Sequence, residues 1–331
     1  MARESVLIIS LGLSPAVVTE TIDALLDKGI NLKRIYIVTS SNESILNKCI
    51  PLLKDEFDNN PQYRGRELRP YDALIQPHTD IIDEMDNTQF MSLVARLMKR
   101  EQDSDVFLGI AGGRKTMAAG MATLGQIFGA RAIVHVLVSP EIEEKGRIDR
   151  LAELSAEQRQ YALHPAERRL ILFPVIGTTW MLEEMVDALK GQVMEDTKTL
   201  GILRLNGLLD SNGKPTSLGS ELLKIIEDIE SFPPPSFKMP EDKIRLPSRE
   251  PNMPKQTLEF VRKLSRNPWV TEIRSREYVN SNETRIVAVE SDGTIVCQYS
   301  DGSKAVKFFV STTAKTKGQA ERVRNSLREF Q

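Results

Sequence analysis

Short apolar runs alternate with longer amphipathic segments over the first 175 residues of the chain. Strand-length apolar runs stand at 5–11, 34–40, 105–111 and 132–139, with a weaker one at 72–78. Segments with helical spacing separate them, at 15–28, 44–57, 87–101 and 115–128. Continuous apolar runs are typical of strands buried on both faces, and repeated β–α units predict an α/β fold with a parallel, doubly wound sheet. Ser14 followed by Pro15 predicts the start of the first helix, with the serine hydroxyl as its cap.

The next stretch, 176–230, has a helical pattern. Two helical segments flank the turn signal Asn212-Gly213, and Thr216 stands at the N-cap position of the second. This order of helix, turn and helix resembles a winged helix-turn-helix. Seven of the 17 prolines then fall within 231–256. Because proline blocks helices and central strands alike, this stretch is expected to be an extended, semi-rigid linker.

The last segment, 257–331, has the pattern of a small α+β domain. A helix is expected at 257–265 and another at 318–330. Four strand patterns stand between them, at 270–278, 284–290, 294–300 and 304–313. The hairpin signals Asp292-Gly293 and Asp301-Gly302 separate strand patterns, which predicts an antiparallel meander.

Composition narrows the class of protein. The 331 residues carry a net charge of −2 and 40% hydrophobic residues, as in ordinary globular proteins. The two cysteines and three histidines show no ligand spacing, so neither a disulfide framework nor a metal site is expected. No signal-peptide pattern or bilayer-length apolar run is evident, so the sequence predicts a cytoplasmic protein without a membrane partner.

Charge is distributed unevenly along the chain. Residues 257–331 hold 13 Lys/Arg and 9 Asp/Glu, which leaves 31 and 37 for the first 256 residues. A basic C-terminal segment on an acidic body is a mild indication of contact with nucleic acid. A normal fluctuation of surface charge explains the same numbers equally well.

Two glycine loops should meet at the carboxyl edge of the predicted parallel sheet. One loop, after the first strand, contains Gly12, Leu13 and Ser14. The other, after the strand at 105–111, contains Gly112, Gly113, Arg114, Lys115 and Thr116. A third loop offers the hydroxyls of Thr39, Ser40 and Ser41 at the same edge.

These loops have the chemistry of a phosphate site. Glycines let backbone N–H groups approach an anion, the helices that follow favour negative charge at their N-termini, and Arg114 and Lys115 add cations. The spacing is neither that of a Walker A loop nor GxGxxG. The alternative is a tight strand–helix turn with surface cations.

Taken together, LGLSPAVVTETIDAL at 11–25 and AGGRKTMA at 111–118 resemble the two signature motifs of CARF domains, the CRISPR-associated Rossmann-fold sensors. The resemblance covers about residues 5–175 and implies a Rossmann-like sheet that binds cyclic oligoadenylate across a homodimer. It implies that Gly12, Leu13 and Ser14 line one side of the ligand and the loop 112–116 the other. The ligand, in particular cyclic tetra-adenylate, would act as an activating signal, with no further cofactor. Some members of this family also cleave their ligand, which leaves open a role for Lys115 at a scissile phosphate.

The helix, four strands and final helix at 257–331 resemble the RelE family of messenger-RNA interferases. With the sensor and the winged helix, the whole chain resembles the CRISPR-Cas-associated mRNA interferases. This resemblance implies a metal-independent, ribosome-dependent endoribonuclease, in which the 2′-hydroxyl of messenger RNA attacks the adjacent phosphate and leaves a 2′,3′-cyclic product. Since this segment has no histidine, cations must move the protons and stabilise the oxyanion. The residues expected to do so are Arg276, Arg285, Lys304, Lys307 and Lys315.

Side chains alternate between the two faces of a strand, so the sequence itself shows which of the expected catalytic residues can share a face. This alternation places Arg274, Arg276 and Tyr278 on one side of one strand. It also places Lys307, Ser311, Thr313 and Lys315 on one side of another strand. Such a face suits RNA, although an ordinary solvated sheet face has the same composition.

A third pattern is discounted. Arg159 and His164 match the Arg-x4–6-His pattern of HEPN ribonucleases. The match stands beside the predicted sensor rather than in a C-terminal helical domain, so no HEPN site is expected.

The sequence thus predicts four parts. They are a CARF sensor at 1–175, a winged helix-turn-helix at 176–230, a linker at 231–256 and a RelE-like domain at 257–331. Two other functions remain open, a ligand-gated transcription regulator that uses the winged helix and a ring nuclease that degrades cyclic oligoadenylate. The acidic segment 217–229 weakens the first, because a DNA-reading helix is normally basic.

Overall fold

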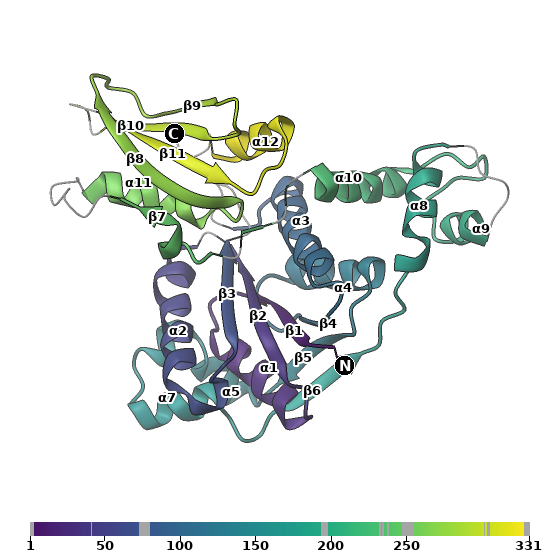
Figure 1. Cartoon of the computed structure of the whole chain (residues 1–331). Coiled ribbons are helices and arrows are strands. Elements are labelled where there is room, and N and C mark those ends of the chain that lie inside the picture. The colour runs from purple at the N-terminus through teal and green to yellow at the C-terminus, as the bar shows by residue number, and fades with distance from the viewer. Residues whose placement is uncertain are drawn as a thin grey trace.

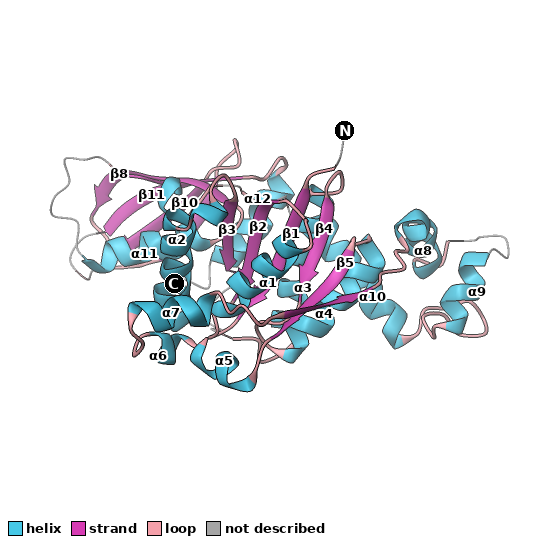
Figure 2. Ribbon diagram, turned by 90° about the horizontal axis from the view of Figure 1, so that it is seen from below, coloured by secondary structure: helices cyan, strands magenta, loops and turns pink. Residues whose placement is uncertain are grey.

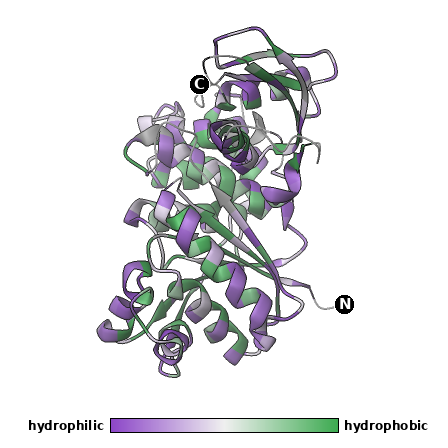
Figure 3. Ribbon diagram, turned by 90° about the vertical axis from the view of Figure 1, so that its left-hand side faces the viewer, coloured by the Kyte–Doolittle hydropathy of each residue, from purple (hydrophilic) through white to green (hydrophobic). Residues whose placement is uncertain are grey.

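The computed structural model consists of two sheets and the helices packed around them (Figure 1). It describes residues 3–40, 42–72, 80–192, 198–231, 233, 235–236, 238–246, 255–300, 302 and 305–327. Hydrophobic residues concentrate along the strands and the inner sides of the helices, and hydrophilic ones on the outer turns (Figure 3).

A six-stranded sheet forms the N-terminal half, in the order β3-β2-β1-β4-β5-β6 (Figure 2). The strands are β1 (Ser5–Leu11), β2 (Leu32–Thr39), β3 (Glu67–Asp72), β4 (Asp105–Gly109), β5 (Ala132–Leu137) and β6 (Arg169–Phe173). The first five run parallel, which confirms the expected α/β fold, whereas β6 pairs antiparallel with β5. Strand order reverses between β1 and β4, and a crevice for a ligand is expected where the loops after these two strands diverge.

Helices cover both faces of this sheet. The helices on one face are α1 (Ala16–Asp27), the π-helix η1 (Ile45–Cys49) and α2 (Ile50–Asn59). Those on the other face are α3 (Glu84–Arg100) and α4 (Lys115–Phe128). The short helices of this half are η2 (Pro61–Tyr63), α5 (Pro140–Lys145), α6 (Ile148–Leu151) and α7 (Ala156–Leu163).

The central strand β1 serves both cores. Val6 and Ile8 pack with α3 and α4, whereas Leu7 and Ile9 pack with α1 and α2. All four side chains are fully buried, and each contributes about 1.5–3 kcal/mol to the free energy of unfolding. This two-sided burial explains why the run at 5–11 is continuously apolar rather than alternating.

The last described residue of β3 is Asp72, so the strand expected at 72–78 lies, apart from Asp72, outside the described residues. The hydroxyl cap expected at Ser14 is wrong, since Pro15 occupies the N-cap position and no side chain caps α1. Pro15 has helical angles, φ −64° and ψ −25°, so the ring itself sets the first turn.

A buried ionic cluster joins α7 to α1 and α2. His164 places Nδ1 2.9 Å from Asp23 Oδ2 and Nε2 3.0 Å from Glu56 Oε1. Burial by itself lowers the pKa of His164, but the two carboxylates outweigh it and raise that pKa to about 9. The hydrogen bond from His164 lowers the pKa of Glu56 to about 2. The imidazole is therefore held in its charged form at neutral pH.

The cluster predicts a pH-dependent contribution to stability. The pKa of His164 rises from 6.5 to about 9 on folding, so its contribution is complete below about pH 6.5 and is lost as pH rises through 9. His164→Gln should lower the free energy of unfolding by about 2–3 kcal/mol near pH 6 and by much less near pH 10. Urea unfolding of both proteins across this range measures the difference. A difference that does not change with pH contradicts a charged imidazole.

The segment after this sheet is helical, as expected. It contains η3 (Thr179–Met181), α8 (Leu182–Leu189), α9 (Lys198–Leu205) and α10 (Ser217–Ser231). The expected cap at Thr216 is confirmed, because its Oγ1 accepts from Gly219 N at 3.2 Å. Ile225 of α10 joins the core beneath α3, and Figure 1 shows α10 against the end of α3. The winged helix-turn-helix stays a prediction.

The described residues of the proline-rich stretch are hydrogen-bonded to helix α3. Arg96 Nη1 donates to Pro233 O and Arg100 Nη1 to Pro235 O, each at 2.8 Å. The stretch then forms η4 (Glu241–Lys243) and the two-residue strand β7 (Ile244–Arg245). These contacts fix the path between α3 and the second sheet.

The C-terminal part of the chain, 255–327, confirms the expected elements closely. They are α11 (Lys255–Arg266), β8 (Val270–Val279), β9 (Arg285–Val289), β10 (Ile295–Ser300), β11 (Ala305–Thr312) and α12 (Lys317–Leu327). Both helices pack on one face of the sheet, where Phe260, Leu264 and Val323 meet Ile273 and Phe308. Among the described residues of this core, no helix packs on the other face.

The expected meander is wrong in one pairing. The sheet order is β7-β8-β11-β10-β9, so β8 lies beside the last strand instead of β9. Hairpin turns form where the sequence signals them, with Gly293 at φ +87° and Gly302 at φ +99°. No such signal stands between β8 and β9, which leaves the place beside β8 to β11.

Candidate functional site

The two glycine loops touch at the point where the strand order reverses. A Cβ on Gly12 would lie 3.2 Å from the Gly113 backbone, and one on Gly112 would lie 2.3 Å from the Ser10 carbonyl oxygen. Ser10 Oγ donates to Gly112 O at 2.6 Å and fixes the second loop against β1. Gly113 has φ +78°, a conformation that side chains other than glycine rarely adopt. The contact therefore depends on glycine at these three positions.

A pocket of about 370 Å³ opens above this contact. Seven of the predicted ligand residues line it: Gly12, Leu13, Ser14, Ser40, Gly112, Gly113 and Arg114. Helix α4 begins beside the pocket at Lys115, and the first N–H groups of a helix have no partner within it. The site can thus offer backbone donors and a guanidinium to an anion.

The remaining predicted ligand residues do not line this pocket. Thr39 is buried and its Oγ1 donates to Leu11 O at 3.1 Å, so it joins the ends of β1 and β2. Lys115 and Thr116 lie exposed in the first turn of α4. Ser41 lies outside the described residues.

Four polar residues of the pocket escape the sequence analysis: Asn42, Asp80, Glu143 and Arg147. Arg114 Nε lies 3.0 Å from both carboxylate oxygens of Asp80, and Arg147 Nε lies 3.3 Å from Asp149 Oδ1. The Arg114 guanidinium lowers the pKa of Asp80. Glu143 and Arg147 follow strand β5, so the rule that parallel strands end at one edge could have found them.

The HEPN-like pair has other roles. Arg159 Nε donates to Leu151 O at 3.1 Å, whereas His164 is held between two carboxylates. Neither side chain lines the pocket, and both hold α7 in place.

The second sheet brings together two of the five predicted catalytic residues. Across three adjacent strands, Lys307 pairs with Gln298, and Gln298 pairs with Arg285. All three lie on the face away from α11 and α12, because Phe308 and Ile286 beside them belong to the helix-covered core. Two strand spacings separate the cations by roughly 10 Å. Arg285 Nη1 lies 3.4 Å from Glu283 Oε2.

The other three predicted catalytic residues do not join this row. Lys315 lies beyond the end of β11, exposed in the turn before α12. Lys304 lies outside the described residues. Arg276 is described only in its backbone, at a shift in register between β8 and β11.

Because of that shift, the expected alternation of side chains along β8 is wrong. Arg274 pairs with Phe309, whereas Tyr278 pairs with Val306. Phe309 and Val306 point to opposite faces of β11, so Arg274 and Tyr278 do not share a side. A bulge inserts one extra residue and reverses the alternation beyond it, which counting along the sequence does not reveal.

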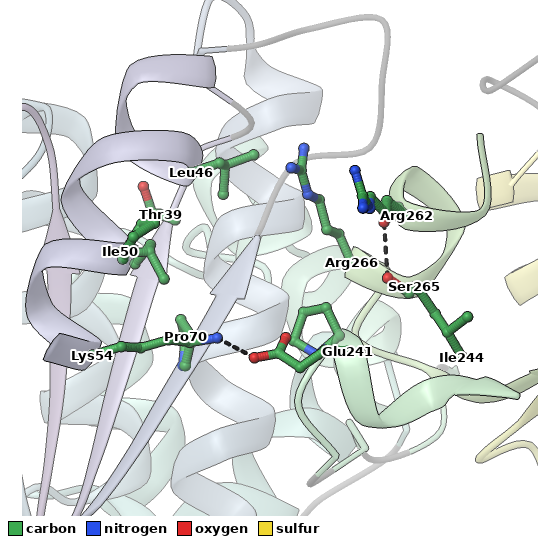
Figure 4. A pocket seen from close by; sticks show the side chains of 12 residues that line it. Thr39, Leu46, Ile50, Lys54, Pro70, Glu241, Ile244, Arg262, Ser265 and Arg266 are labelled. Atoms are coloured by element: carbon green, nitrogen blue, oxygen red, sulfur yellow. Dashed lines mark hydrogen bonds and ion pairs between the residues drawn. The ribbon is translucent and has the colours of Figure 1, made fainter. Parts of the chain in front are cut away.

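A second pocket, of about 240 Å³, lies between the two halves of the chain (Figure 4). Lys54 of α2 reaches across it to form an ion pair with Glu241 of η4. Arg262 and Arg266 of α11 stand on the opposite wall, and Arg266 Nη2 donates to Asn47 Oδ1 at 3.3 Å. The π-helix η1 therefore lines the first pocket through Ile45 and the second through Leu46.

No helix among the described residues is long and apolar enough to span a membrane. No group of three or more His, Cys, Asp and Glu side chains in the same part of the chain is placed to hold a metal ion.

Strand order, glycine loops and pocket define a Rossmann-like α/β protein with a pocket between glycine loops at the carboxyl edge of its sheet. Residues 14–207, more than half of the chain, match the family CRISPR-associated protein NE0113. The chain belongs to this family. No curated protein matches it.

Two solved structures are similar to the chain. One is Csm6 from Enterococcus italicus bound to cyclic hexa-2′-fluoro-hexa-dAMP, with 11% identity and a TM-score of 0.38 over 69% of this chain and 56% of that one. The other is Can2 from Sulfobacillus thermosulfidooxidans in complex with cyclic tetra-adenylate, with 11% identity and a TM-score of 0.31 over 69% and 65%. The chain spans between about half and two thirds of the length of these proteins.

Proposed function

We propose that this chain is a ribonuclease of type III CRISPR antiviral defence that is activated by cyclic oligoadenylate, in particular cyclic tetra-adenylate. The observation that supports this most is the contact between the loops of Gly12 and Gly112 at the reversal point of the sheet, in a chain that belongs to a CRISPR-associated family. Backbone donors and Arg114 suit phosphate, and the three glycines let the two loops pack closely against each other beneath the pocket.

The ligand would bind across a homodimer. Lys115 and Thr116 face outward beside the pocket, so a second copy placed there would receive them. The edge strand β6 of the same sheet exposes Ile171, Leu172 and Phe173. An unpaired strand edge with exposed apolar side chains favours association with another protein surface.

The second sheet would cleave messenger RNA held by the ribosome, in a RelE-like domain at 257–331. The 2′-hydroxyl oxygen attacks the phosphorus, its proton passes to a base, and the leaving 5′-oxygen takes up a proton, which yields a 2′,3′-cyclic phosphate. Arg285 and Lys307 would flank the phosphate and stabilise its extra negative charge. No metal ion is needed for these steps.

Signal transfer would pass through the segment between the two pockets. Ile45 of η1 lines the ligand pocket. The rest of η1 and the helix α2 that continues it line the second pocket, where they meet η4 and α11. A ligand with higher affinity for one arrangement of this contact would shift the population toward it. The winged helix-turn-helix and the linker at 231–256 would complete the path through α3.

The two other functions make different predictions. A transcription regulator needs a helix free to enter a DNA groove, and the burial of Ile225 against α3 disfavours α10 in that role. A ring nuclease would degrade the ligand without ribosomes and lose this activity in Lys115→Ala.

The test combines the purified full-length protein with translating ribosomes and cyclic oligoadenylates of each ring size. We expect messenger cleavage that depends on ligand and on ribosomes, with 2′,3′-cyclic phosphate ends. Cleavage that no ring size changes would contradict the proposal. Operator binding that responds to ligand would support the regulator instead.

A further inference from the structure

The pocket already contains an anionic group of the protein itself, the carboxylate of Asp80. Arg114 Nε lies 3.0 Å from each carboxylate oxygen of Asp80, and Nη2 forms a further bond to Oδ2. Asp80 is itself held by the backbone, because Ile81 N donates to its Oδ1 at 2.8 Å. Both residues line the pocket. The carboxylate thus occupies the donors that a phosphate would use.

We propose that Asp80 is an internal competitor that sets the affinity of this pocket for phosphate. A phosphate must displace the carboxylate from Arg114 before it can pair with the guanidinium. A single phosphate gains little from this exchange, whereas a ligand with several phosphates retains its contacts with the glycine loops. Asp80 therefore lowers the affinity of every ligand that needs Arg114, and a ligand with several phosphates retains enough other contacts to bind.

The charge balance of the pocket agrees with such a role. Its charged side chains are Arg114, Arg147, Asp80 and Glu143, two of each sign. The pocket is therefore neutral at rest, although its glycine loops are suited to an anion. The hydrogen bond from Arg114 lowers the pKa of Asp80, so the carboxylate stays ionised at neutral pH and continues to compete for the guanidinium.

The test is Asp80→Asn in the full-length protein, which keeps the shape and removes the charge. Two ligands are titrated by calorimetry at low and high salt, cyclic tetra-adenylate and inorganic pyrophosphate. Glu143→Gln is the matched control, because it removes the same charge from the same pocket without touching Arg114. We expect Asp80→Asn to bind both ligands about 3- to 10-fold more tightly, with the larger gain at low salt. Glu143→Gln should change affinity about 2-fold or less.

A double-variant cycle isolates the competition. In a protein that already carries Arg114→Ala, Asp80→Asn should raise ligand affinity by no more than Glu143→Gln does, because no guanidinium remains to be released. The side-chain Nε resonance of Arg114 should also move less when pyrophosphate binds the wild type than when it binds Asp80→Asn.

The outcomes separate this inference from the function on which it rests. Tighter pyrophosphate binding in Asp80→Asn without any binding of cyclic oligoadenylate would support the competitor and contradict the proposed ligand. Unchanged or weaker binding of both ligands in Asp80→Asn would overturn the competitor. Weaker binding in particular would mean that Asp80 positions Arg114 for the ligand.

Discussion

Gly112→Ala is expected to weaken the binding of cyclic oligoadenylate by about 100-fold or more, which corresponds to the loss of two charge-assisted hydrogen bonds of about 1.5–3 kcal/mol each. The new Cβ would lie 2.3 Å from the Ser10 carbonyl oxygen, a backbone atom at the end of β1 that cannot rotate away. The loop must therefore shift, and its N–H groups and Arg114 shift with it. Calorimetric titration of the full-length protein measures the loss.

Two companion variants make this result interpretable. Gly201→Ala adds the same methyl group on α9 with no atom within 4 Å, and it should bind ligand as the wild type does. Arg114→Ala leaves the glycine contact intact and should weaken binding by about 10-fold or more. If Gly112→Ala retains its circular dichroism and melting temperature and binds with wild-type affinity, the loop is not the ligand site.

Arg285→Ala and Lys307→Ala are each expected to reduce ligand-activated RNA cleavage by about 100- to 1,000-fold, the usual cost of one lost donor to a transition-state oxyanion. Both residues lie on the helix-free face of the second sheet, in one row across Gln298. Neither lines the ligand pocket, so the dissociation constant of the ligand should stay within about 2-fold. Single-turnover cleavage on programmed ribosomes separates the chemical step from RNA binding.

Arg324→Ala is the control for loss of positive charge. Arg324 belongs to α12, which covers the opposite face of the same sheet, so cleavage should change little. Full activity in Arg285→Ala and Lys307→Ala would exclude the sheet face that carries these two residues as the nuclease surface. Loss of ligand binding in Lys307→Ala would contradict the division into sensor and effector.

The ligand pocket shows which site residues can be predicted from the sequence and which cannot. Gly12, Gly112 and Gly113 could be predicted because each follows a buried strand, and parallel strands end at the same edge of a sheet. Asp80 could not be, since its contact with Arg114 joins residues 34 positions apart through a segment without a clear pattern. Lys115 is adjacent to Arg114 in sequence but does not line the pocket. Arg114 precedes α4 in an extended conformation, with φ −79° and ψ 154°, whereas Lys115 is the first residue of the helix.

In the second sheet, the sequence predicted the elements but not how the strands pair. Apolar periodicity predicted its four long strands and two helices, since the pattern reflects burial that each element needs locally. It did not predict that β8 lies beside β11, nor the bulge near Arg276. Strands compete for neighbours when the sheet forms, so their pairing depends on all of them together. A bulge adds one residue to a strand without changing its composition, so the sequence pattern does not reveal it.

The sequence by itself determined which segments are strands and helices, the glycine loops and the basic character of the last 75 residues, because these follow from local spacing and side-chain chemistry. Only the tertiary structure decided which cations act together. It set Asp80 against Arg114, placed Arg285 in line with Lys307 and left Lys315 apart, because ion pairs and sheet faces depend on distances between segments that the chain brings together only when it folds.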